Sequence, residues 1–489
     1  MQVRAVVASD GALNNLPTSA RPRVDPADVV VPEGYRAEVV MAGLSFPTAI
    51  EFAPDGTVFV AEGGSTWPTR PYMPARLLSL DPGGKLDVIA IEGLGGPRGM
   101  AWRDGQLYVS LKGGYEMRVV KYDLRTRERS IVVKGVPSGG WHEPGGPVFG
   151  PDGMMYFGQG SIALNGAVEA EGFTVDLAKH PLAHDVPGQD VTLTGENVWS
   201  RDPTAPYPYY ARTGPYKPFG TPAEAGEVVR GQKFCSTCVM RARPDGSDPE
   251  LLAWGVRNPW GMAFDEQGEL YVADLCMEEK GDRAVAEDPG KVWHIKKARE
   301  PFGSVTTPDW YGFPEISGDG LPVWNPKHLP NRGAPARPLL RDPPPWAGPA
   351  AYLVEPHAAL GKLDFCRSDA FGHRGQMFLC LFGTYYPLNT IRPEARDRGF
   401  NVQRVDLATK QAETFLHNKH PGPATEHRSG GIERPVDCKF HPDGESLYVL
   451  DFGRHVAYRS TVVAYARTGV LWKITRERDG AGAAGGRAS

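Results

Sequence analysis

The stretch PGGPVFGPDGMMYFGQGS (residues 144–161) consists of two short apolar runs joined by the turn-forming residues Pro151-Asp152-Gly153. Asp-Gly between apolar runs is typical of a β-hairpin, and proline is tolerated at the first residue of a strand, where its missing N–H costs least. An aromatic residue, Phe149, lies five positions after Pro144. The stretch therefore predicts an antiparallel hairpin that opens at a proline.

The same pattern recurs along the chain. Its copies begin at five prolines and, with a longer turn, at one leucine: Pro47, Pro97, Pro144, Pro259, Pro435 and Leu360. The spacing between the first three starts, at 47, 97 and 144, suits the 40 to 50 residues of a four-stranded propeller blade. The sequence therefore predicts an all-β fold, a six-bladed β-propeller with four-stranded antiparallel blades and long loop insertions.

The spacing of the repeats also predicts the domain limits. The propeller is expected to span residues 33–475, after an N-terminal extension over 1–32 and before a tail over 476–489 whose composition is that of a disordered segment. The longer spacings fall at residues 161–234 and 299–350, which are rich in turn-forming residues. We expect both to be loop insertions of the propeller.

Charge and hydropathy exclude two classes of partner. The net charge is −4 and no basic block occurs, so nothing indicates nucleic acid binding. No run approaches the roughly 18 consecutive apolar residues of a membrane span. The first residues also lack the pattern of a secretory leader. These features favour a protein that acts on a small molecule.

The six cysteines give a mixed signal. Three lie in or beside apolar runs, which favours buried free thiols: Cys366, Cys380 and Cys438. Cys235 and Cys238 form a Cys-x-x-Cys pair, which suits a redox pair or, with Cys276 as a third thiolate, a structural zinc site. No histidine follows Cys238, which excludes covalent c-type haem.

Equivalent positions of successive blades form a ring about the propeller axis, so the residues beside each strand start are expected to meet at one mouth of the channel. That ring comprises Ser45, Phe46, Arg98, His142, Glu143, Arg257, Asn258, His357, Lys362, Glu433 and Arg434. Its four cations outnumber its two acids, which suits a polyanionic ligand. A histidine titrates near pH 6.5, so His142 is the candidate general base. Glu143 is expected to be solvated or paired with an arginine.

Several stretches resemble the glucose/sorbosone dehydrogenase family. They are AWGVRNPWGMAFDEQGELYVAD, GDRAVAEDPGKVWHI, PDWYGFPEISG, RPVDCKFHPDGESLYVLD and GFNVQRVDL. In addition, HEPGGPVFGPDGMMYFGQG matches that family's His-x-x-Gly ahead of Gly-Pro-Asp. The resemblance covers roughly residues 33 to 475.

The resemblance implies a six-bladed propeller that carries pyrroloquinoline quinone (PQQ) with calcium over the channel and passes electrons from a sugar or alcohol to an external acceptor. His142 would take the proton of the sugar's C1 hydroxyl while hydride moves to the C5 carbonyl of the quinone. Arg257 would stabilise the negative charge that develops on that carbonyl. The residues that the resemblance implies for cofactor binding are Arg98, Asn258, Lys362, Arg434 and Arg467.

The chain also departs from the family's glucose enzyme. Gly146 stands where that enzyme has arginine, and Leu275 and Cys276 stand where its glycine and proline carbonyls bind the cofactor's calcium. Backbone carbonyls do not depend on the side chain, so these two residues remain the expected calcium ligands. The resemblance implies a periplasmic or extracellular location, whereas the given chain begins without a leader.

Two other functions are compatible with a propeller. A sugar lactonase would hold a metal with side chains from several blades, for which Glu62, Asn258, Asp274 and Asp451 are available. The cationic ring disfavours that reaction. A binding propeller without catalysis would have little use for His142, Arg257 and Lys362 around one axis. The sequence therefore favours the sugar dehydrogenase.

Overall fold

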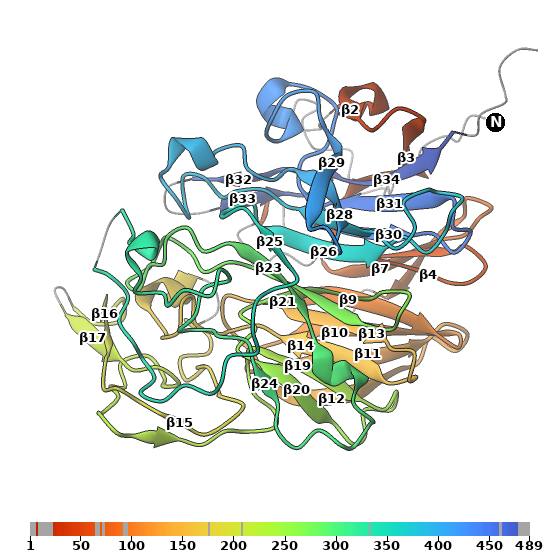
Figure 1. Ribbon diagram of the computed structural model, residues 1–489. Helices are drawn as coiled ribbons and strands as arrows, with labels where there is room; N and C mark the ends of the chain where they lie inside the picture. The colour runs from red at the N-terminus through yellow and green to blue at the C-terminus, as the bar shows by residue number, and fades with distance from the viewer. Residues whose placement is uncertain are drawn as a thin grey trace, which may run out of the picture.

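The computed structural model describes residues 6–7, 23–63, 69–70, 74–90, 96–174, 177–206, 209–331, 334–458 and 462–477. Strands dominate it, and six antiparallel sheets are arranged as the blades of a propeller (Figure 1). The predicted fold class is therefore confirmed. Within the described residues, no helix has the length and apolar character that a membrane crossing requires.

Each blade contains four strands. The first two blades are β4 (Ala49–Phe52), β5 (Val58–Glu62), β7 (Arg76–Leu80) and β8 (Leu86–Ala90), then β9 (Gly96–Arg103), β10 (Gln106–Lys112), β11 (Glu116–Asp123) and β12 (Arg129–Pro137). The third and fourth are β13 (Pro144–Phe149), β14 (Met155–Gln159), β19 (Cys238–Ala242) and β20 (Glu250–Trp254), then β21 (Pro259–Phe264), β22 (Leu270–Asp274), β23 (Gly290–His294) and β25 (Tyr352–Val354). The last two are β26 (Leu360–Phe365), β27 (Met377–Leu381), β28 (Asn401–Asp406) and β29 (Gln411–Asn418), then β30 (Pro435–Phe440), β31 (Ser446–Asp451), β34 (Gly469–Arg476) and β3 (Tyr35–Leu44).

The two ends of the chain close the ring together. β3 is antiparallel to β34, from Tyr35 opposite Arg476 to Leu44 opposite Gly469 with two register shifts between, so the sixth blade takes its outer strand from the N-terminal side. Part of the predicted extension over 1–32 adds edge strands, since β2 (Val29–Val30) pairs with β29 and β1 (Val6–Val7) pairs with β3. The remainder of that extension and residues 478–489 of the predicted tail lie outside the described residues.

The inner strands follow the sequence repeat. β13, β21 and β30 begin at the predicted prolines and β26 begins at Leu360, while β4 starts two residues after Pro47 and β9 one residue before Pro97. Neighbouring inner strands pack side by side in the order β4, β9, β13, β21, β26 and β30, and β30 contacts β4. The inner strands therefore enclose one central channel.

In five of the six repeats, the aromatic residue five positions after the repeat start contacts an aromatic residue of a neighbouring blade. Phe264 contacts Tyr156 of the preceding blade, with ring centroids 5.0 Å apart and planes at 76°. Equivalent pairs are Phe52 with Tyr448, Phe149 with Tyr108, Phe365 with Tyr271 and Phe440 with Phe378, at 5.0 to 5.2 Å. Such pairs contribute about 0.5–1.5 kcal/mol each beyond their buried area. The repeat thus encodes both the hairpin and its contact with the next blade.

The insertions carry short elements of their own. Residues 161–234 contain η3 (Ala170–Thr174) and two small sheets, β15 (Val191–Thr192) with β18 (Val228–Val229) and β16 (Val198–Arg201) with β17 (Tyr210–Thr213). β15, β16 and β17 lie to the left of the blades in Figure 1. Residues 299–350 contain η5 (Pro326–His328) and β24 (Asp309–Trp310), which pairs with β20. The remaining short elements are η2 (Pro26–Asp28), β6 (Thr69–Arg70), η4 (Lys296–Arg299), η6 (Pro393–Ala395), η7 (Ala424–His427), β32 (His455–Ala457) and β33 (Val462–Tyr465).

All six cysteines are buried free thiols. This confirms the expectation for Cys366, Cys380 and Cys438, which are at most 1% exposed. Cys235 and Cys238 lie in the core of the third blade. Within the described part of the chain, these two thiols and Cys276 do not converge on a common metal position. The zinc alternative is therefore wrong.

Candidate active site

All six blades contribute to one cavity on the propeller axis. This axial cavity has a volume of about 150 Å³. Residues at or beside the starts of the inner strands line one part of it: Thr48, Arg98, Trp141, His142, Glu143, Asn258, Trp260, Ala359, Leu360 and Val436. The loops that follow the second strands of blades four to six line the rest: Leu275, Glu278, Lys280, Phe382, Tyr385, Leu388, Phe452 and His455. Strand starts far apart in the sequence thus meet at one mouth of the channel.

His142 precedes β13 and lies in the wall of the axial cavity, only 4% exposed. Its Nδ1 is 3.0 Å from the carbonyl oxygen and 2.7 Å from Oγ of Ser161. No hydrogen bond within the described residues engages Nε2. Burial and, after it, the charge of Arg257 lower the pKa of His142 well below 6.5. The structure thus supplies a neutral imidazole with one ring nitrogen available to a ligand.

Arg98 and Glu143 form an ion pair in the same wall. Arg98 Nε donates to Glu143 Oε2 at 2.6 Å, and Lys112 Nζ lies 3.6 Å from Glu143 Oε1. Burial raises the pKa of Glu143, but Arg98 and Lys112 outweigh it and the pKa lies below its usual range. The carboxylate is therefore the arginine-paired neighbour, one of the two states expected for it.

Asn258 and Arg257 point to opposite sides of the chain, as successive residues of an extended backbone do. Asn258 lines the axial cavity, and its Oδ1 accepts the Glu143 N–H at 3.3 Å. Arg257 is fully buried behind the wall, where Nε donates to Leu164 O at 3.0 Å and Nη1 donates to Cys276 O. Its Nη2 makes no hydrogen bond and lies 3.6 Å from Glu278 Oε1. Arg257 therefore acts on the axial cavity through its charge.

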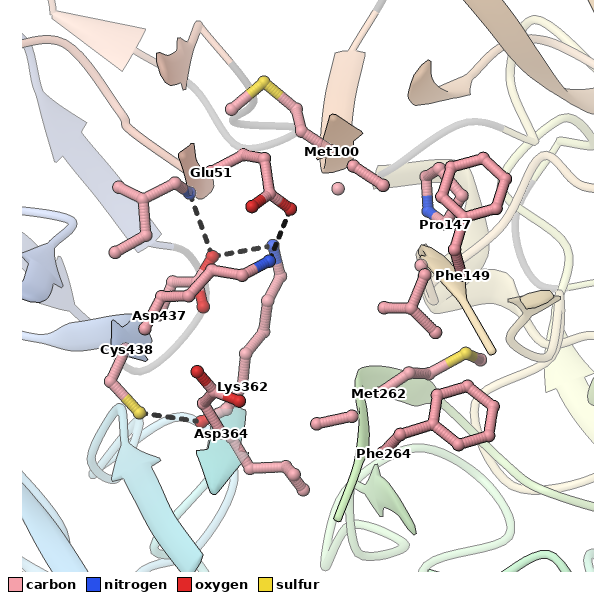
Figure 2. A pocket seen from close by; sticks show the side chains of 18 of the residues that line it. Glu51, Met100, Pro147, Phe149, Met262, Phe264, Lys362, Asp364, Asp437 and Cys438 are labelled. Atoms are coloured by element: carbon pink, nitrogen blue, oxygen red, sulfur yellow. Dashed lines mark hydrogen bonds and ion pairs between the residues drawn. The ribbon is translucent and has the colours of Figure 1, made fainter. Parts of the chain in front are cut away.

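Lys362 lies outside the axial cavity. Its Nζ donates to Thr48 O and Arg98 O, both at 2.7 Å. It also donates to Asp437 Oδ2 at 3.3 Å (Figure 2). It lines a second cavity of about 290 Å³, which includes Trp260 in common with the axial cavity. All three N–H groups of the ammonium are engaged by the protein. Lys362 therefore occupies the channel between the two cavities.

The other two predicted cations also lie outside the axial cavity. Arg434 is buried, with Nε donating to His455 O at 2.8 Å and Nη1 donating to the carbonyls of Phe382, Gly383 and Thr384 at 2.9 to 3.3 Å. Arg467 lies in the turn before β34, where its backbone N–H donates to Ser45 Oγ at 3.2 Å. Of the predicted cofactor-binding residues, only Arg98 and Asn258 line the axial cavity. The wall of the axial cavity is therefore not the predicted ring of cations, because it combines cations, acids and aromatic residues.

The backbone conformation at position 146 explains why a glycine stands there. Its φ is +71°, a region that disfavours residues with a side chain, and an added Cβ would lie 2.7 Å from Tyr156 O. Ser110 Oγ also donates to Gly146 O at 2.7 Å. The backbone of β13 at this position therefore excludes the arginine of the family's glucose enzyme.

The aromatic part of the axial cavity was not predicted from the sequence. Trp141, Trp260, Phe382, Tyr385 and Phe452 line it, together with Lys280, whose Nζ lies 3.9 Å from the centre of the Trp141 ring. A signal was present, because Phe-Gly follows the second strand in both the fifth and sixth blades, at 382–383 and 452–453. This repeat position marks the loops that close over the channel.

The residues predicted to bind metal are engaged by the protein. Cys276 O accepts from the Arg257 guanidinium, which does not fit the expected calcium at Leu275 and Cys276. Three of the four candidate lactonase ligands lie outside the axial cavity. Glu62 pairs with Arg76, Asp274 accepts from Asn258 N and Trp293 Nε1, and Asp451 accepts from three backbone N–H groups. Cys276 O and three of the candidate side-chain ligands are thus held by protein donors in this structure, and both metal sites remain predictions.

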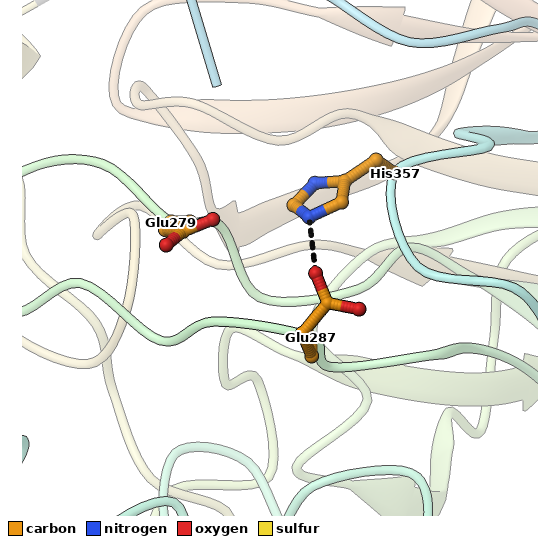
Figure 3. A group of neighbouring side chains, drawn as sticks. All are labelled: Glu279, Glu287 and His357. Carbon is orange, nitrogen blue, oxygen red and sulfur yellow. Dashed lines mark ion pairs between the residues drawn. The ribbon is translucent and has the colours of Figure 1, made fainter. Parts of the chain in front are cut away.

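Glu279, Glu287 and His357 form the one metal-compatible group that the described residues contain (Figure 3). His357 Nε2 is 3.4 Å from Glu287 Oε1. Arg392 Nε lies 3.0 Å from Glu279 and 3.2 Å from Glu287, so one guanidinium bridges both carboxylates. Because that cation compensates the acids, the group is an ion-pair cluster that links the fourth and fifth blades.

The protonation of Glu169 is expected to make the stability of the folded protein depend on pH. This residue is 2% exposed and accepts the backbone N–H of Asp282, in the loop that carries Lys280, and burial raises the pKa of Glu169 to about 8. The folded state thus binds the proton more tightly than the unfolded chain, so this contribution to stability is lost as the pH rises from about 4.5 to 8. We expect Glu169→Gln to reduce the fall in Tm between pH 5 and 9. An equal fall in the variant would contradict the assignment.

Comparison with known proteins shows the fold. No family model matches this chain, and no curated protein matches it in sequence. The holo PQQ domain of pyranose dehydrogenase from Coprinopsis cinerea is 16% identical over 93% of this chain and 98% of that chain, with a TM-score of 0.55. Two structures of a Trichoderma reesei protein of Carbohydrate-Active Enzymes Family AA12, with iodide and with calcium, are 14% identical over 93% of this chain and 99% and 98% of theirs, with TM-scores of 0.53 and 0.52. At these identities the likeness establishes a shared architecture along nearly the whole chain.

Proposed function

We propose that this protein is a PQQ-dependent dehydrogenase that oxidises an aldose or a related sugar or alcohol and passes the electrons to an external acceptor. The observation that carries the proposal is His142, a neutral imidazole with an unengaged Nε2 in the wall of an axial cavity. The architecture shared with the PQQ domain of a pyranose dehydrogenase supports it. The reaction class is therefore removal of hydrogen from a CH–OH group.

The donor set of the axial cavity fits PQQ, a flat tricyclic quinone with three carboxylates. Trp260, Tyr385 and Phe452 offer aromatic faces for the ring, and Asn258 offers an amide. Arg98 and Lys280 are the cations that would face the carboxylates. When bound, the quinone supplies a carbonyl carbon that accepts hydride. The Cys276 carbonyl accepts from the Arg257 guanidinium, which does not fit calcium there, so we assign no step to that ion.

The residues of this chain supply proton transfer and orientation. Nε2 of His142 takes the proton of the substrate hydroxyl, because its lone pair is an unengaged basic site in the wall of the axial cavity. Burial and, after it, the charge of Arg257, which is fully buried behind that wall, keep the imidazole neutral. The aromatic side chains exclude water, which strengthens these electrostatic effects. Arg257 thus supports the base from behind the cavity.

The proposal predicts the pH dependence of the reaction. A general base must be unprotonated, so kcat/KM falls as the pH drops through the pKa of His142. Since burial and Arg257 hold that pKa well below 6.5, we expect kcat/KM to be constant from pH 6.5 to 8 and to fall only at lower pH. A pH profile with a substrate whose own groups do not titrate in this range measures it. An acid limb centred at or above 6.5 would contradict the role of His142.

A cofactor titration tests the function. Purified apo-protein is mixed with PQQ, with and without calcium, and the quinone absorbance is followed before aldoses are added one at a time with an artificial electron acceptor. We expect a bound-quinone spectrum, bleaching by at least one sugar, and reduction of the acceptor. No spectral binding and no reduction with any sugar would exclude the proposal. Acid release from sugar lactones with added divalent metal would then test the lactonase alternative.

A further inference from the structure

We propose that Ser161 is the residue that fixes the ring tautomer of His142, an inference that rests on the proposed role of His142 as the base. Both oxygens of Ser161 face Nδ1 of the ring, the carbonyl at 3.0 Å and Oγ at 2.7 Å. Ser161 Oγ is also 2.8 Å from the carbonyl oxygen of Ala163. Ser161 is 0% exposed, so these contacts are shielded from bulk solvent.

The two neutral tautomers satisfy these contacts unequally. With the proton on Nδ1, the ring donates to Ser161 O and Oγ, and the hydroxyl donates to Ala163 O. With the proton on Nε2, the hydroxyl must donate to Nδ1, so Ala163 O loses its donor and the Nδ1 lone pair faces the lone pairs of Ser161 O. A carbonyl cannot donate, and two facing acceptors repel. The network therefore selects the Nδ1–H tautomer and leaves the Nε2 lone pair as the proton acceptor.

The chain around Ser161 is fixed from both sides. The Ser161 N–H donates to Arg257 O at 2.7 Å, and Ser161 O accepts the backbone N–H of His142 at 3.2 Å. Beyond it, the two oxygens of Asp185 accept the N–H groups of Ile162 and Ala163 at 2.7 and 3.0 Å. Asp185 is 3% exposed and belongs to the insertion over 161–234. The insertion, through Asp185, therefore fixes the position of the Ser161 oxygens that orient the His142 ring.

This arrangement orients the ring and raises its basicity less than a carboxylate would. A carboxylate beside Nδ1 would orient the ring and also raise its pKa, because it stabilises the imidazolium. Serine and carbonyl oxygens orient it without adding a full negative charge. When Nε2 takes the substrate proton, the Nδ1 proton stays in place and the positive charge remains on the ring. Ser161 thus acts as a positioning residue through His142.

The tautomer can be measured without turnover. Protein labelled with ¹⁵N-histidine, with the His142 signals assigned from the His142→Gln variant, gives separate ring-nitrogen shifts for the two tautomers above the pKa. We expect the Nδ1–H form in the wild-type apo-protein. A predominant Nε2–H form would overturn the inference. An Nδ1–H form in a protein that oxidises no sugar would support it and would refute only the proposed function.

Two serine variants test the hydroxyl. Ser161→Ala is expected to increase the share of the Nε2–H tautomer and to lower kcat by about threefold to tenfold, the effect of one hydrogen bond, with KM within twofold. Ser110→Ala is the matched control, because Ser110 is also 0% exposed and its Oγ donates to Gly146 O, away from His142. It should lower Tm without changing the tautomer. An unchanged tautomer in Ser161→Ala, or an equal change in Ser110→Ala, would overturn the assignment.

Discussion

Replacing His142 by alanine is expected to lower turnover by about 10²–10⁴ while cofactor binding is retained. The variant removes Nε2, the proposed proton acceptor in the wall of the axial cavity. It leaves Arg98, Asn258 and Lys280, the polar groups that fit the cofactor, in place. Single-turnover reduction of the bound quinone by excess sugar, followed by absorbance, measures the effect separately from electron transfer to the acceptor.

A second histidine provides the control for this experiment. His294 pairs with Glu269 at 2.7 Å on the fourth blade and does not line the axial cavity, so His294→Ala should leave turnover within about twofold. Comparable loss of cofactor binding and of turnover in His142→Ala would show that His142 is structural. The comparison thus separates a catalytic from a packing role.

The repeat made the fold predictable because its residues act locally. A strand-opening proline, an Asp-Gly turn and an aromatic at a fixed offset each specify a short-range feature, and the aromatic also specifies the neighbouring blade. Phe264 meets Tyr156 although 108 residues separate them, because both occupy fixed positions in adjacent blades. The ring of strand starts followed from the same geometry, which is why Arg98, His142 and Asn258 line one cavity.

Side-chain direction could not be predicted in the same way. Arg257 and Asn258 are neighbours in the sequence, yet only Asn258 faces the axial cavity. Arg434 is also beside a strand start, but its guanidinium is held by four backbone carbonyls from two loops. A sequence does not show which carbonyls lack a donor once the loops have folded, and these carbonyls decide where a buried cation goes.

The loops that close the site were the least predictable part. His455 lines the axial cavity at 4% exposure beside Phe382 and Phe452, from the start of the short strand β32, which has no repeat signal of its own. Asp185, in the middle of the long insertion, reaches the chain next to His142 through Ile162 and Ala163. Both positions depend on long-range packing of irregular segments, which have no periodicity to indicate which residues face inward.

Replacing Lys362 tests whether it binds the cofactor, as predicted from the sequence, or stabilises the fold, as its contacts in the structure indicate. If Lys362 bound cofactor carboxylates, Lys362→Met would lower cofactor affinity and leave stability near that of the wild type. The structure predicts the opposite, because its three N–H groups are donated to Thr48 O, Arg98 O and Asp437 Oδ2. Methionine would leave Asp437, 5% exposed, without its cation. We expect the free energy of unfolding to fall by about 3–5 kcal/mol, measured by guanidinium denaturation.

The loss of stability in Lys362→Met should depend on pH and on the charge of Asp437. Burial raises the pKa of Asp437 even beside Lys362, so the carboxyl of Lys362→Met gains a proton readily as the pH falls, and the loss of stability should shrink between pH 7 and pH 5. The double variant Lys362→Met/Asp437→Leu removes both charges and should recover most of the loss, because an apolar pair replaces a buried ion pair at little cost. It should not recover all of it, since Thr48 O and Arg98 O still lack a donor. A single variant as stable as the wild type but deficient in quinone binding would return Lys362 to the cofactor site.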